Sequence, residues 1–211
     1  MSKAFSDYEK ELIQKRLLEH GFKLFSIYGL KKTNIEEIAE LASISKGAFY
    51  SFYGSKEALF MEVIEQAEKH ARQEILAAID LPGASNRARL LTVLKKAYSL
   101  FREIPILQFI TGGDYDLLFR RVPADKLQKH LENDRAFIDD LITHCQAAGI
   151  PIQVPPEQMI KLLYPMALTI VHEDELQKIG FVGNIDLFLE LVAAYCLGEI
   201  QSDHPAERKQ I

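Results

Sequence analysis

Side chains that can donate hydrogen bonds to DNA gather in one short stretch, residues 45 to 56. Lys46 can donate to the acceptors of guanine, Ala48 can contact the methyl group of thymine, and Ser51 can pair with several bases. Gly47, beside them, would let the backbone approach a phosphate closely. These residue types at this spacing indicate a short helix that lies in the major groove and reads base edges with its first turns.

Each of these residues also has a purely structural explanation. Lys46 can be a solvated lysine at a helix start, and Tyr50 and Tyr53 can be half-buried packing residues. A helical hairpin inside a core would show a similar pattern. The DNA interpretation is favoured because the helix is only about two turns long, its outward face carries Lys46, Tyr50 and Ser51, and Gly47 costs about 1 kcal/mol of helix propensity.

A first helix and a turn must precede this short helix. Thr33 and Glu36 predict a capping box at the start of the first helix, and Ser43 with Ile44 predicts a tight turn after it. If the backbone of Ser43 is left-handed, a residue other than glycine costs about 1 kcal/mol there. The apolar face of the first helix is formed by Ile35, Ile38, Leu41 and Ala42.

The short helix begins after Ser45, whose hydroxyl is a suitable N-cap. Phe49 and Phe52 are three residues apart, so both are predicted to face inward against the first helix. Gly54 ends the short helix, and Ser55 caps a long helix that follows. The pattern is therefore a helix-turn-helix joined directly to a long helix.

Residues 45 to 60 read SKGAFYSFYGSKEALF, which resembles the signature of the tetracycline-repressor (TetR) family. The resemblance extends upstream through residues 24–29 and Thr33, and it covers residues 8 to 62. The sequence departs from the family pattern at Ser43, where glycine is usual, at Gly21, where alanine is commoner, and at Tyr53, where phenylalanine is usual. These departures leave the resemblance intact because the remaining residue types fall in register without a gap.

The resemblance implies roles for individual residues. It implies base-edge or close backbone contacts for Ser45, Lys46, Gly47, Ala48 and Ser51, and phosphate contacts for Thr33, Tyr50, Tyr53 and Lys56. It also implies a ligand-responsive transcriptional regulator of the repressor type. Such a protein binds a palindromic double-stranded DNA operator as a homodimer and is released by a small, largely apolar effector. The sequence leaves open whether binding represses or activates transcription.

Charge is distributed unevenly along the 211 residues, whose formal net charge is −5. Residues 1 to 56 contain nine Lys and Arg against seven Asp and Glu, whereas the remainder contains sixteen against twenty-three. The more positive part therefore carries the helix-turn-helix, as a nucleic-acid binder requires.

Other features predict a cytoplasmic protein without membrane association. The N-terminal residues are polar and mixed in charge, so we expect no signal peptide. The longest apolar run covers residues 162–171 and contains Pro165, which is too short for a transmembrane helix. Cys145 and Cys196 are isolated, and we expect buried thiols rather than a disulfide.

Helical periodicity continues to the end of the chain, and no segment alternates like a strand. We therefore predict an all-α fold with a three-helix DNA-binding domain, residues 1–55, and a larger helical effector-binding and dimerisation domain, residues 56–211. Outside the helix-turn-helix, the predicted helices cover residues 7–28, 56–79, 86–103, 124–148, 157–172 with a possible continuation to 179, and 185–200. The buried face of the first is predicted to hold Leu17, Leu18, Phe22, Leu24, Phe25 and Tyr28.

The larger domain is predicted to contain both an effector pocket and a dimer interface. The candidate pocket residues are apolar and aromatic side chains with a few polar groups that would orient a ligand: Phe101, Arg102, Phe109, Tyr115, Phe119, Phe137, Tyr164 and Met166. The helix over residues 185–200 is apolar nearly all round, so it needs partners on both sides, either in the core of a monomer or in a dimer. The candidate interface residues are Leu162, Ile170, Leu187, Phe188, Leu191, Ala194 and Tyr195.

Two other functional classes remain as alternatives, a helical enzyme and a protein-interaction module without sequence-specific DNA binding. His144 and Cys145 are adjacent on a helix, so their side chains diverge and do not suggest a catalytic pair. His172 precedes three acidic residues, a pattern more typical of a solvated helix end than of a metal site. We predict no catalytic residue, cofactor or metal. A turnover assay and the salt dependence of DNA binding would separate the three classes.

Overall fold

The computed structural model describes residues 5–108, 118, 120–180 and 185–200. Every regular element in these ranges is helical, which confirms the predicted all-α class. The helices are α1 (Asp7–Lys32), α2 (Ile35–Leu41), α3 (Lys46–Phe52), α4 (Lys56–Ala77), η1 (Ala78–Asp80), α5 (Asn86–Glu103), α6 (Pro105–Gln108), α8 (Ala124–Ala147), α9 (Pro156–Val171), α10 (Glu173–Lys178) and α11 (Ile185–Cys196).

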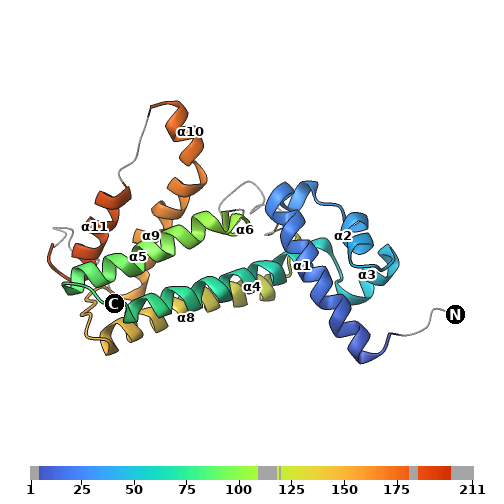
Figure 1. Ribbon diagram of the computed structural model, residues 1–211, viewed down its shortest axis with the longest axis horizontal. Helices are drawn as coiled ribbons and strands as arrows, with labels where there is room; N and C mark the ends of the chain where they lie inside the picture. Colours follow the sequence, from blue (N-terminus) through green and yellow to red (C-terminus); the bar gives the residue numbers. More distant parts are fainter. Residues whose placement is uncertain (1–4, 109–117, 119, 181–184, 201–211) are drawn as a thin grey trace, which may run out of the picture.

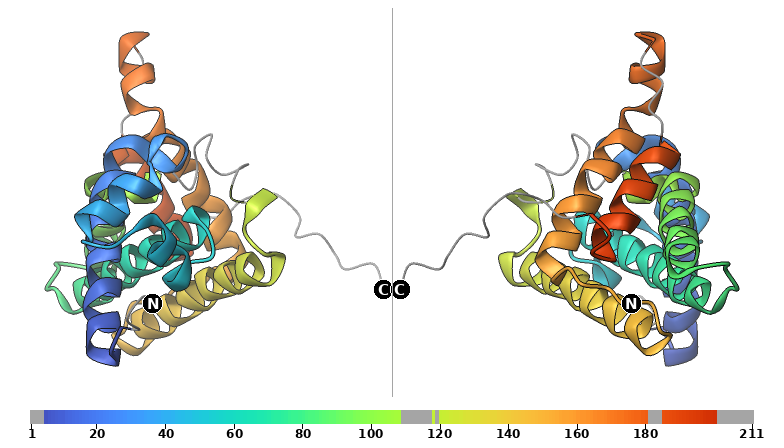
Figure 2. Two further views of the ribbon diagram at one scale, coloured as in Figure 1. Left: turned by 90° about the vertical axis from the view of Figure 1, so that its right-hand side faces the viewer. Right: turned by 90° about the vertical axis from the view of Figure 1, so that its left-hand side faces the viewer.

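Helices α1, α2 and α3 form one end of the molecule, and α4 leads from that end into the rest of the chain (Figure 1). Helix α4 contacts α1 at its beginning and α8 and α5 further along. Helix α5 in turn contacts α11 and α9, and α10 projects away from the body (Figure 2). One helix is thus shared by the helix-turn-helix and the larger helical body.

Helix α1 begins with a complete capping box between Ser6 and Glu9. Its regular part ends where predicted, because Gly29 has φ of 70° and ψ of 177°, a conformation that favours glycine. The predicted buried face is wrong at Phe22 and Tyr28, whose side chains are 39% and 49% exposed. The two rings lie on a part of the α1 surface that other helices cover only partly.

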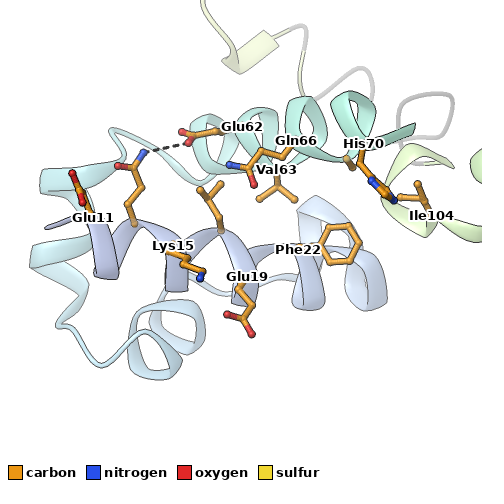
Figure 3. Close-up of a pocket in the computed structure, with 12 residues that line it drawn as sticks. Glu11, Lys15, Glu19, Phe22, Glu62, Val63, Gln66, His70 and Ile104 are labelled. Carbon is orange, nitrogen blue, oxygen red and sulfur yellow. Dashed lines mark hydrogen bonds between the residues drawn. The ribbon is translucent and has the colours of Figure 1, made fainter. Parts of the chain in front are cut away.

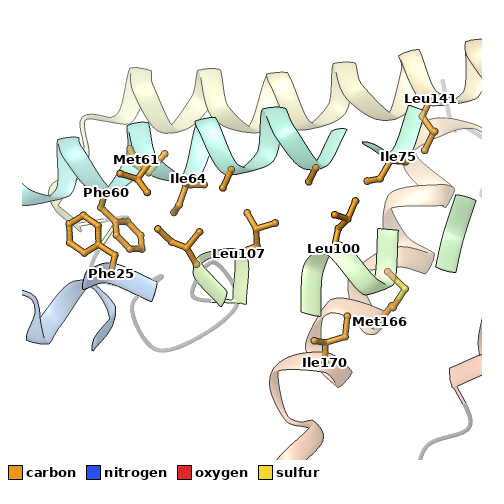
Figure 4. Close-up of a cluster of buried hydrophobic side chains, with 14 of the residues drawn as sticks. Phe25, Phe60, Met61, Ile64, Ile75, Leu100, Leu107, Leu141, Met166 and Ile170 are labelled. Atoms are coloured by element: carbon orange, nitrogen blue, oxygen red, sulfur yellow. The ribbon is translucent and has the colours of Figure 1, made fainter. Parts of the chain in front are cut away.

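A continuous apolar core joins the two parts of the molecule (Figure 4). Near the helix-turn-helix, the rings of Phe25 and Phe60 meet edge to face with centroids 4.9 Å apart. The same core continues along α4 through Ile64 and Ile75. At Gly21 an added Cβ would lie 3.2 Å from Leu59, so the glycine allows α1 and α4 to pack closely.

The C-terminal helices differ from the prediction in their ends. Helix α9 stops at Val171, and α10 begins after His172, whose backbone at φ −104° and ψ 14° interrupts the helical hydrogen bonding. The predicted continuation to residue 179 is therefore two helices. Helix α11 ends at Cys196 rather than near residue 200, and Gly198 with φ of 70° terminates it. None of the described helices combines the length and apolar character of a membrane-spanning segment.

Candidate nucleic-acid interface and effector cavity

The helix-turn-helix forms as predicted except at its first cap. Asn34, not Thr33, is the N-cap of α2, and its Oδ1 accepts a 3.0 Å hydrogen bond from the Glu36 N–H. The predicted capping box is therefore wrong, because Thr33 and Asn34 are both good capping residues and the helix starts one residue later. The turn holds Ser43 at φ of 61°, the left-handed conformation that glycine adopts more easily. Ser45 caps α3 by accepting from the Ala48 N–H.

Helix α3 has one buried face and one exposed face. Phe49 is fully buried, and its ring lies 5.9 Å from that of Tyr53, between centroids. Phe52 is half-buried and its ring centroid lies 6.0 Å from that of Phe5. The inward orientation predicted for both phenylalanines agrees with this packing, so α3 is fixed by its own aromatic residues.

The opposite face of α3 carries residues predicted to contact DNA. Ser45, Lys46, Gly47, Tyr50 and Ser51 are exposed there, and Tyr50 shows 48% of its surface. An added Cβ at Gly47 would meet only the Ser45 hydroxyl, at 3.9 Å, so packing does not require this glycine. Ala48 is half-buried, and its methyl group is therefore less available than predicted.

Lys46 is already paired within the chain. Its ammonium donates to Glu36 of α2, and both side chains are about half exposed. The hydrogen bond from Lys46 lowers the pKa of the Glu36 carboxyl, and the same bond raises the pKa of Lys46. Contact between Lys46 and a base or phosphate therefore requires an exchange of partners.

Three predicted phosphate contacts have structural roles here. The Thr33 hydroxyl is buried and donates to the Gly29 carbonyl at 2.6 Å. The Lys56 ammonium donates to the Thr33 carbonyl at 2.8 Å, which ties the start of α4 to the link between α1 and α2. Tyr53 is 5% exposed and burial raises the pKa of its hydroxyl. The side chains of Thr33 and Tyr53 thus face inward, because the aromatic core and the end of α1 occupy them, whereas Lys56 stays half-buried at the surface.

Comparison with known proteins shows which family the helix-turn-helix region resembles. Residues 17–63 match the family model described as bacterial regulatory proteins, tetR family. Residues 17–63 therefore form a TetR-type helix-turn-helix domain. The matched range contains the kink of α1, the whole helix-turn-helix and the first turns of α4.

Curated relatives support the same TetR-type domain. The uncharacterized HTH-type transcriptional regulator YuxN of Bacillus subtilis is 29% identical over 128 residues, which are 57% of this chain and 44% of YuxN. The HTH-type transcriptional regulator RutR of Escherichia coli is 40% identical over 53 residues, 25% of each chain. The chain thus matches less than half the length of these relatives. Both relatives are named as regulators, and the TetR family consists of regulators rather than enzymes.

Solved structures extend the similarity to the whole TetR-type fold. The fatty acid degradation regulator FadR from Bacillus halodurans aligns with a TM-score of 0.60 and 12% identity, covering 92% of this chain and 97% of FadR. A TetR family transcription regulator from Marinobacter aquaeolei VT8 aligns with a TM-score of 0.56 and 14% identity over 92% and 97%. At these identities the likeness concerns the fold alone.

A cavity of about 450 Å³ lies beside the predicted effector residues and is lined by residues of α4, α5, α6, α8 and α9. Its volume lies within the range of ordinary ligand sites. Phe101, Phe137 and Tyr164 line it, together with apolar residues such as Leu107, Ile138 and Leu163. We call it the α4–α8 cavity.

Other predicted pocket residues lie elsewhere. Arg102 is exposed and Met166 is buried in the core, and neither lines the α4–α8 cavity. Each of these two side chains projects from a face of its helix that does not border the cavity. Phe109, Tyr115 and Phe119 lie outside the described residues.

A charged cluster at one end of the α4–α8 cavity was missed from the sequence. Arg72 donates to Glu68 on α4, at 3.2 Å, and to Asp134 on α8. His130 Nε2 faces the same two carboxylates. Burial raises the pKa of Glu68 to about 8, and the nearby Asp134 adds to the rise. Only the spacing within each helix could have indicated it. Glu68 and Arg72 are four residues apart on α4, and His130 and Asp134 are four residues apart on α8, so each pair shares one helix face.

A second hollow, of about 800 Å³, lies between α1 and α4 (Figure 3). Its wall includes the exposed ring of Phe22 but also charged and amide groups such as Lys15, Glu62 and Gln66. It is larger than the α4–α8 cavity, but charged side chains make up more of its lining, and its wall is less apolar. The apolar lining therefore favours the α4–α8 cavity for an apolar effector.

The predicted interface residues divide into two groups. Leu187 and Leu191 on α11 are 52% and 51% exposed, so they form an apolar stripe on the surface of the chain. Ile170 and Ala194 are buried within the chain itself, because they face the helices packed behind them. The remaining three residues, Leu162, Phe188 and Tyr195, are half-buried.

Proposed function

We propose that this chain is a DNA-binding transcriptional regulator that binds a palindromic operator as a homodimer. The observation that carries this proposal is the exposed face of α3, where Lys46, Tyr50 and Ser51 stand on a helix fixed by buried Phe49. A short rigid helix with donors on its free face fits the major groove. The TetR-type relatives named above support the same function.

Lys46 and Lys56 would take different parts in DNA binding. Lys46 lies in the first turn of α3, where it can exchange Glu36 for a base edge or a phosphate. Lys56 lies in the first turn of α4, where free backbone N–H groups also favour an anion. Lys46 would therefore contribute to sequence preference and Lys56 to affinity for any duplex.

Dimer formation would supply the second recognition helix. One α3 spans only a few base pairs, whereas two copies related by a two-fold axis read an inverted repeat. The exposed apolar side chains of Leu187 and Leu191 on α11 support an interface there. Analytical ultracentrifugation tests this step, and a mass of 24 kDa that does not change at micromolar protein would contradict it.

The α4–α8 cavity would bind the effector, and α4 would transmit the effect. Residues of α4 line the cavity at Ala71 and Ile75, and its first turn carries Lys56 and Glu57. Glu57 also accepts from Arg121 at 3.3 Å, which joins α4 to the segment before α8. A coupling of about 1–3 kcal/mol between effector and operator is enough for a switch.

The decisive experiment is selection of DNA from a random pool, followed by footprinting of the recovered sequence. We expect a protected inverted repeat, and affinity that falls steeply as salt rises, because lysine contacts to phosphates release counterions. Absence of a protected repeat at low ionic strength would exclude the proposal. Salt-insensitive binding to a protein partner would then favour an interaction module.

A further inference from the structure

The charged cluster of the α4–α8 cavity contains three potential metal ligands that converge on one point. Glu68 comes from α4, and His130 and Asp134 come from successive turns of α8. One ligand atom from each lies within 4.8 Å of the others. His130 Nε2 is 3.6 Å from Glu68 Oε1 and 3.7 Å from Asp134 Oδ2. These separations are too long for hydrogen bonds, so the three atoms face one another without pairing.

The separations fit a bound cation. Zinc bonds to imidazole and carboxylate ligands are about 2.0–2.2 Å long, which places two ligands of a tetrahedral site about 3.4 Å apart. The observed nitrogen-to-oxygen separations exceed this value by only a few tenths of an ångström. Small rotations of the side chains would therefore bring the ligands to bonding distance.

Arg72 holds the two carboxylates in the required orientation. It binds Glu68 through Oε2 and Asp134 through Oδ1, so the other oxygen of each carboxylate remains directed at His130. Arg72 is itself fixed, because its guanidinium lies 5.2 Å from the ring centroid of Phe137 and also donates to the Asn133 carbonyl. Such supporting contacts are typical of metal sites, where they orient the ligands.

The His130 imidazole is buried and faces the other two candidate ligands. Its side chain is 7% exposed, and its Nδ1 is buried without a hydrogen-bond partner among the described residues. A cation bound at Nε2 would not satisfy Nδ1, so the feature that points to a cation is the buried Nε2. The other nitrogen of the ring, Nε2, is directed at the carboxyl groups of Glu68 and Asp134.

We propose that Glu68, His130 and Asp134 form a binding site for a divalent transition-metal cation such as Zn²⁺. One imidazole and two carboxylates suit zinc better than magnesium or calcium, which prefer oxygen ligands alone. A water molecule or a donor group of a ligand in the cavity would complete the four-coordinate site. The cation can reach the site from the α4–α8 cavity and from an adjoining hollow that Glu68 and His130 also line. The sequence did not predict this metal site. Glu68 lies 62 and 66 positions before His130 and Asp134, and the last two share α8 without forming a recognised metal-binding motif.

The site can be tested on the free protein without DNA. The full chain is treated with chelator, dialysed, and titrated with Zn²⁺ in an isothermal calorimeter at neutral pH, with excess Mg²⁺ present. We expect one tight equivalent per chain. His130→Gln and Asp134→Asn, each checked for native helicity by circular dichroism, should weaken binding about 100-fold or more, since loss of a direct ligand exceeds the effect of losing a supporting contact.

His144→Gln is the matched control. His144 lies on the same helix and its Nδ1 is 3.1 Å from Asp140 Oδ1, but both side chains are about half exposed. This variant should bind zinc as the unaltered chain does. Cobalt(II) added in place of zinc should give the visible absorption bands of a tetrahedral complex, and His130→Gln should remove them.

Three outcomes would overturn the metal site. They are absence of a tight equivalent in the unaltered chain, equal zinc affinity in His130→Gln and His144→Gln, or cobalt bands that survive His130→Gln. Each would leave an ion-pair network around Arg72 as the explanation of the cluster. None would bear on operator binding, which is measured separately.

Discussion

The ion pair beside α3 and the charged cluster beside the α4–α8 cavity use the same chemistry in opposite surroundings. Lys46 and Glu36 are each about half exposed, whereas Glu68 and His130 are 14% and 7% exposed. Water and salt screen the first pair, so its partners exchange at little cost. In the second group Glu68 and His130 are largely shielded from water, so a charge on either of them needs a partner. An exposed pair therefore suits reversible DNA contact, and a buried one suits a structural or ligand-binding role.

The largest expected effect comes from removing the cation of the buried cluster. Arg72→Met should lower the free energy of unfolding by about 3 kcal/mol, because Glu68 and Asp134 lose their shared partner. The value is at the low end for a buried pair because the side chains of Arg72 and Asp134 are 24% and 43% exposed. Lys46→Met should leave stability unchanged. Urea denaturation in the presence of chelator measures both variants, and equal losses would remove the distinction between the two sites.

A second effect concerns DNA affinity rather than stability. Lys56→Ala should weaken binding to operator and random DNA alike and reduce the salt-dependence slope by about one unit. Lys46→Ala should instead reduce the preference for one base about ten-fold. Fluorescence anisotropy over a series of salt concentrations tests both variants. Equal losses on operator and random DNA for the two variants would contradict the separate roles of these lysines.

A smaller effect should follow from freeing Lys46. Glu36→Gln removes the carboxylate that pairs with it and a negative charge near the DNA phosphates. We expect all duplexes to bind about two- to five-fold more tightly, so that discrimination between operator and random DNA falls. Glu37→Gln, an exposed residue on the same helix, is the matched control for net charge. If both variants tighten binding equally, the ion pair has no specific role.

A last prediction concerns burial in the larger domain rather than DNA binding. Burial raises the pKa of Cys145 and of Cys196 to about 11, from 9.0 in an unfolded chain. The folded protein then binds more protons between these two values, so stability falls as pH rises through that window. At pH 8 the native thiols should react with iodoacetamide about 100-fold more slowly than the denatured ones. Rapid native alkylation would show that the helices around these thiols open readily.

The sequence was most informative where the structure is local. Capping by Ser45, the left-handed turn at Ser43 and the burial of Phe49 all depend on residues within one short segment. Even there, Thr33 was wrongly predicted as the N-cap of α2, because its neighbour Asn34 is equally able to cap that helix. The face of a helix was predictable from periodicity, but a choice between adjacent capping residues was not.

The cavity could not be predicted in the same way, because it depends on how helices pack across the chain. Periodicity shows that α4 and α8 are amphipathic, but not which turn of one meets which turn of the other. The meeting of Glu68 with His130 depends on that register. Arg102 and Met166 were misplaced for the same reason, since a modest rotation of a helix decides whether a side chain faces a cavity, the solvent or the core.

The length of α4 has a mechanical consequence. A helix of 22 residues is about 33 Å long. If its far end were held by a filled cavity, a tilt of about 5° would displace its first turn by about 3 Å, close to the 3.4 Å between successive bases on a strand. Movements of less than an ångström beside Ala71 or Ile75 could thus be magnified into a mismatch of nearly one base pair at the groove.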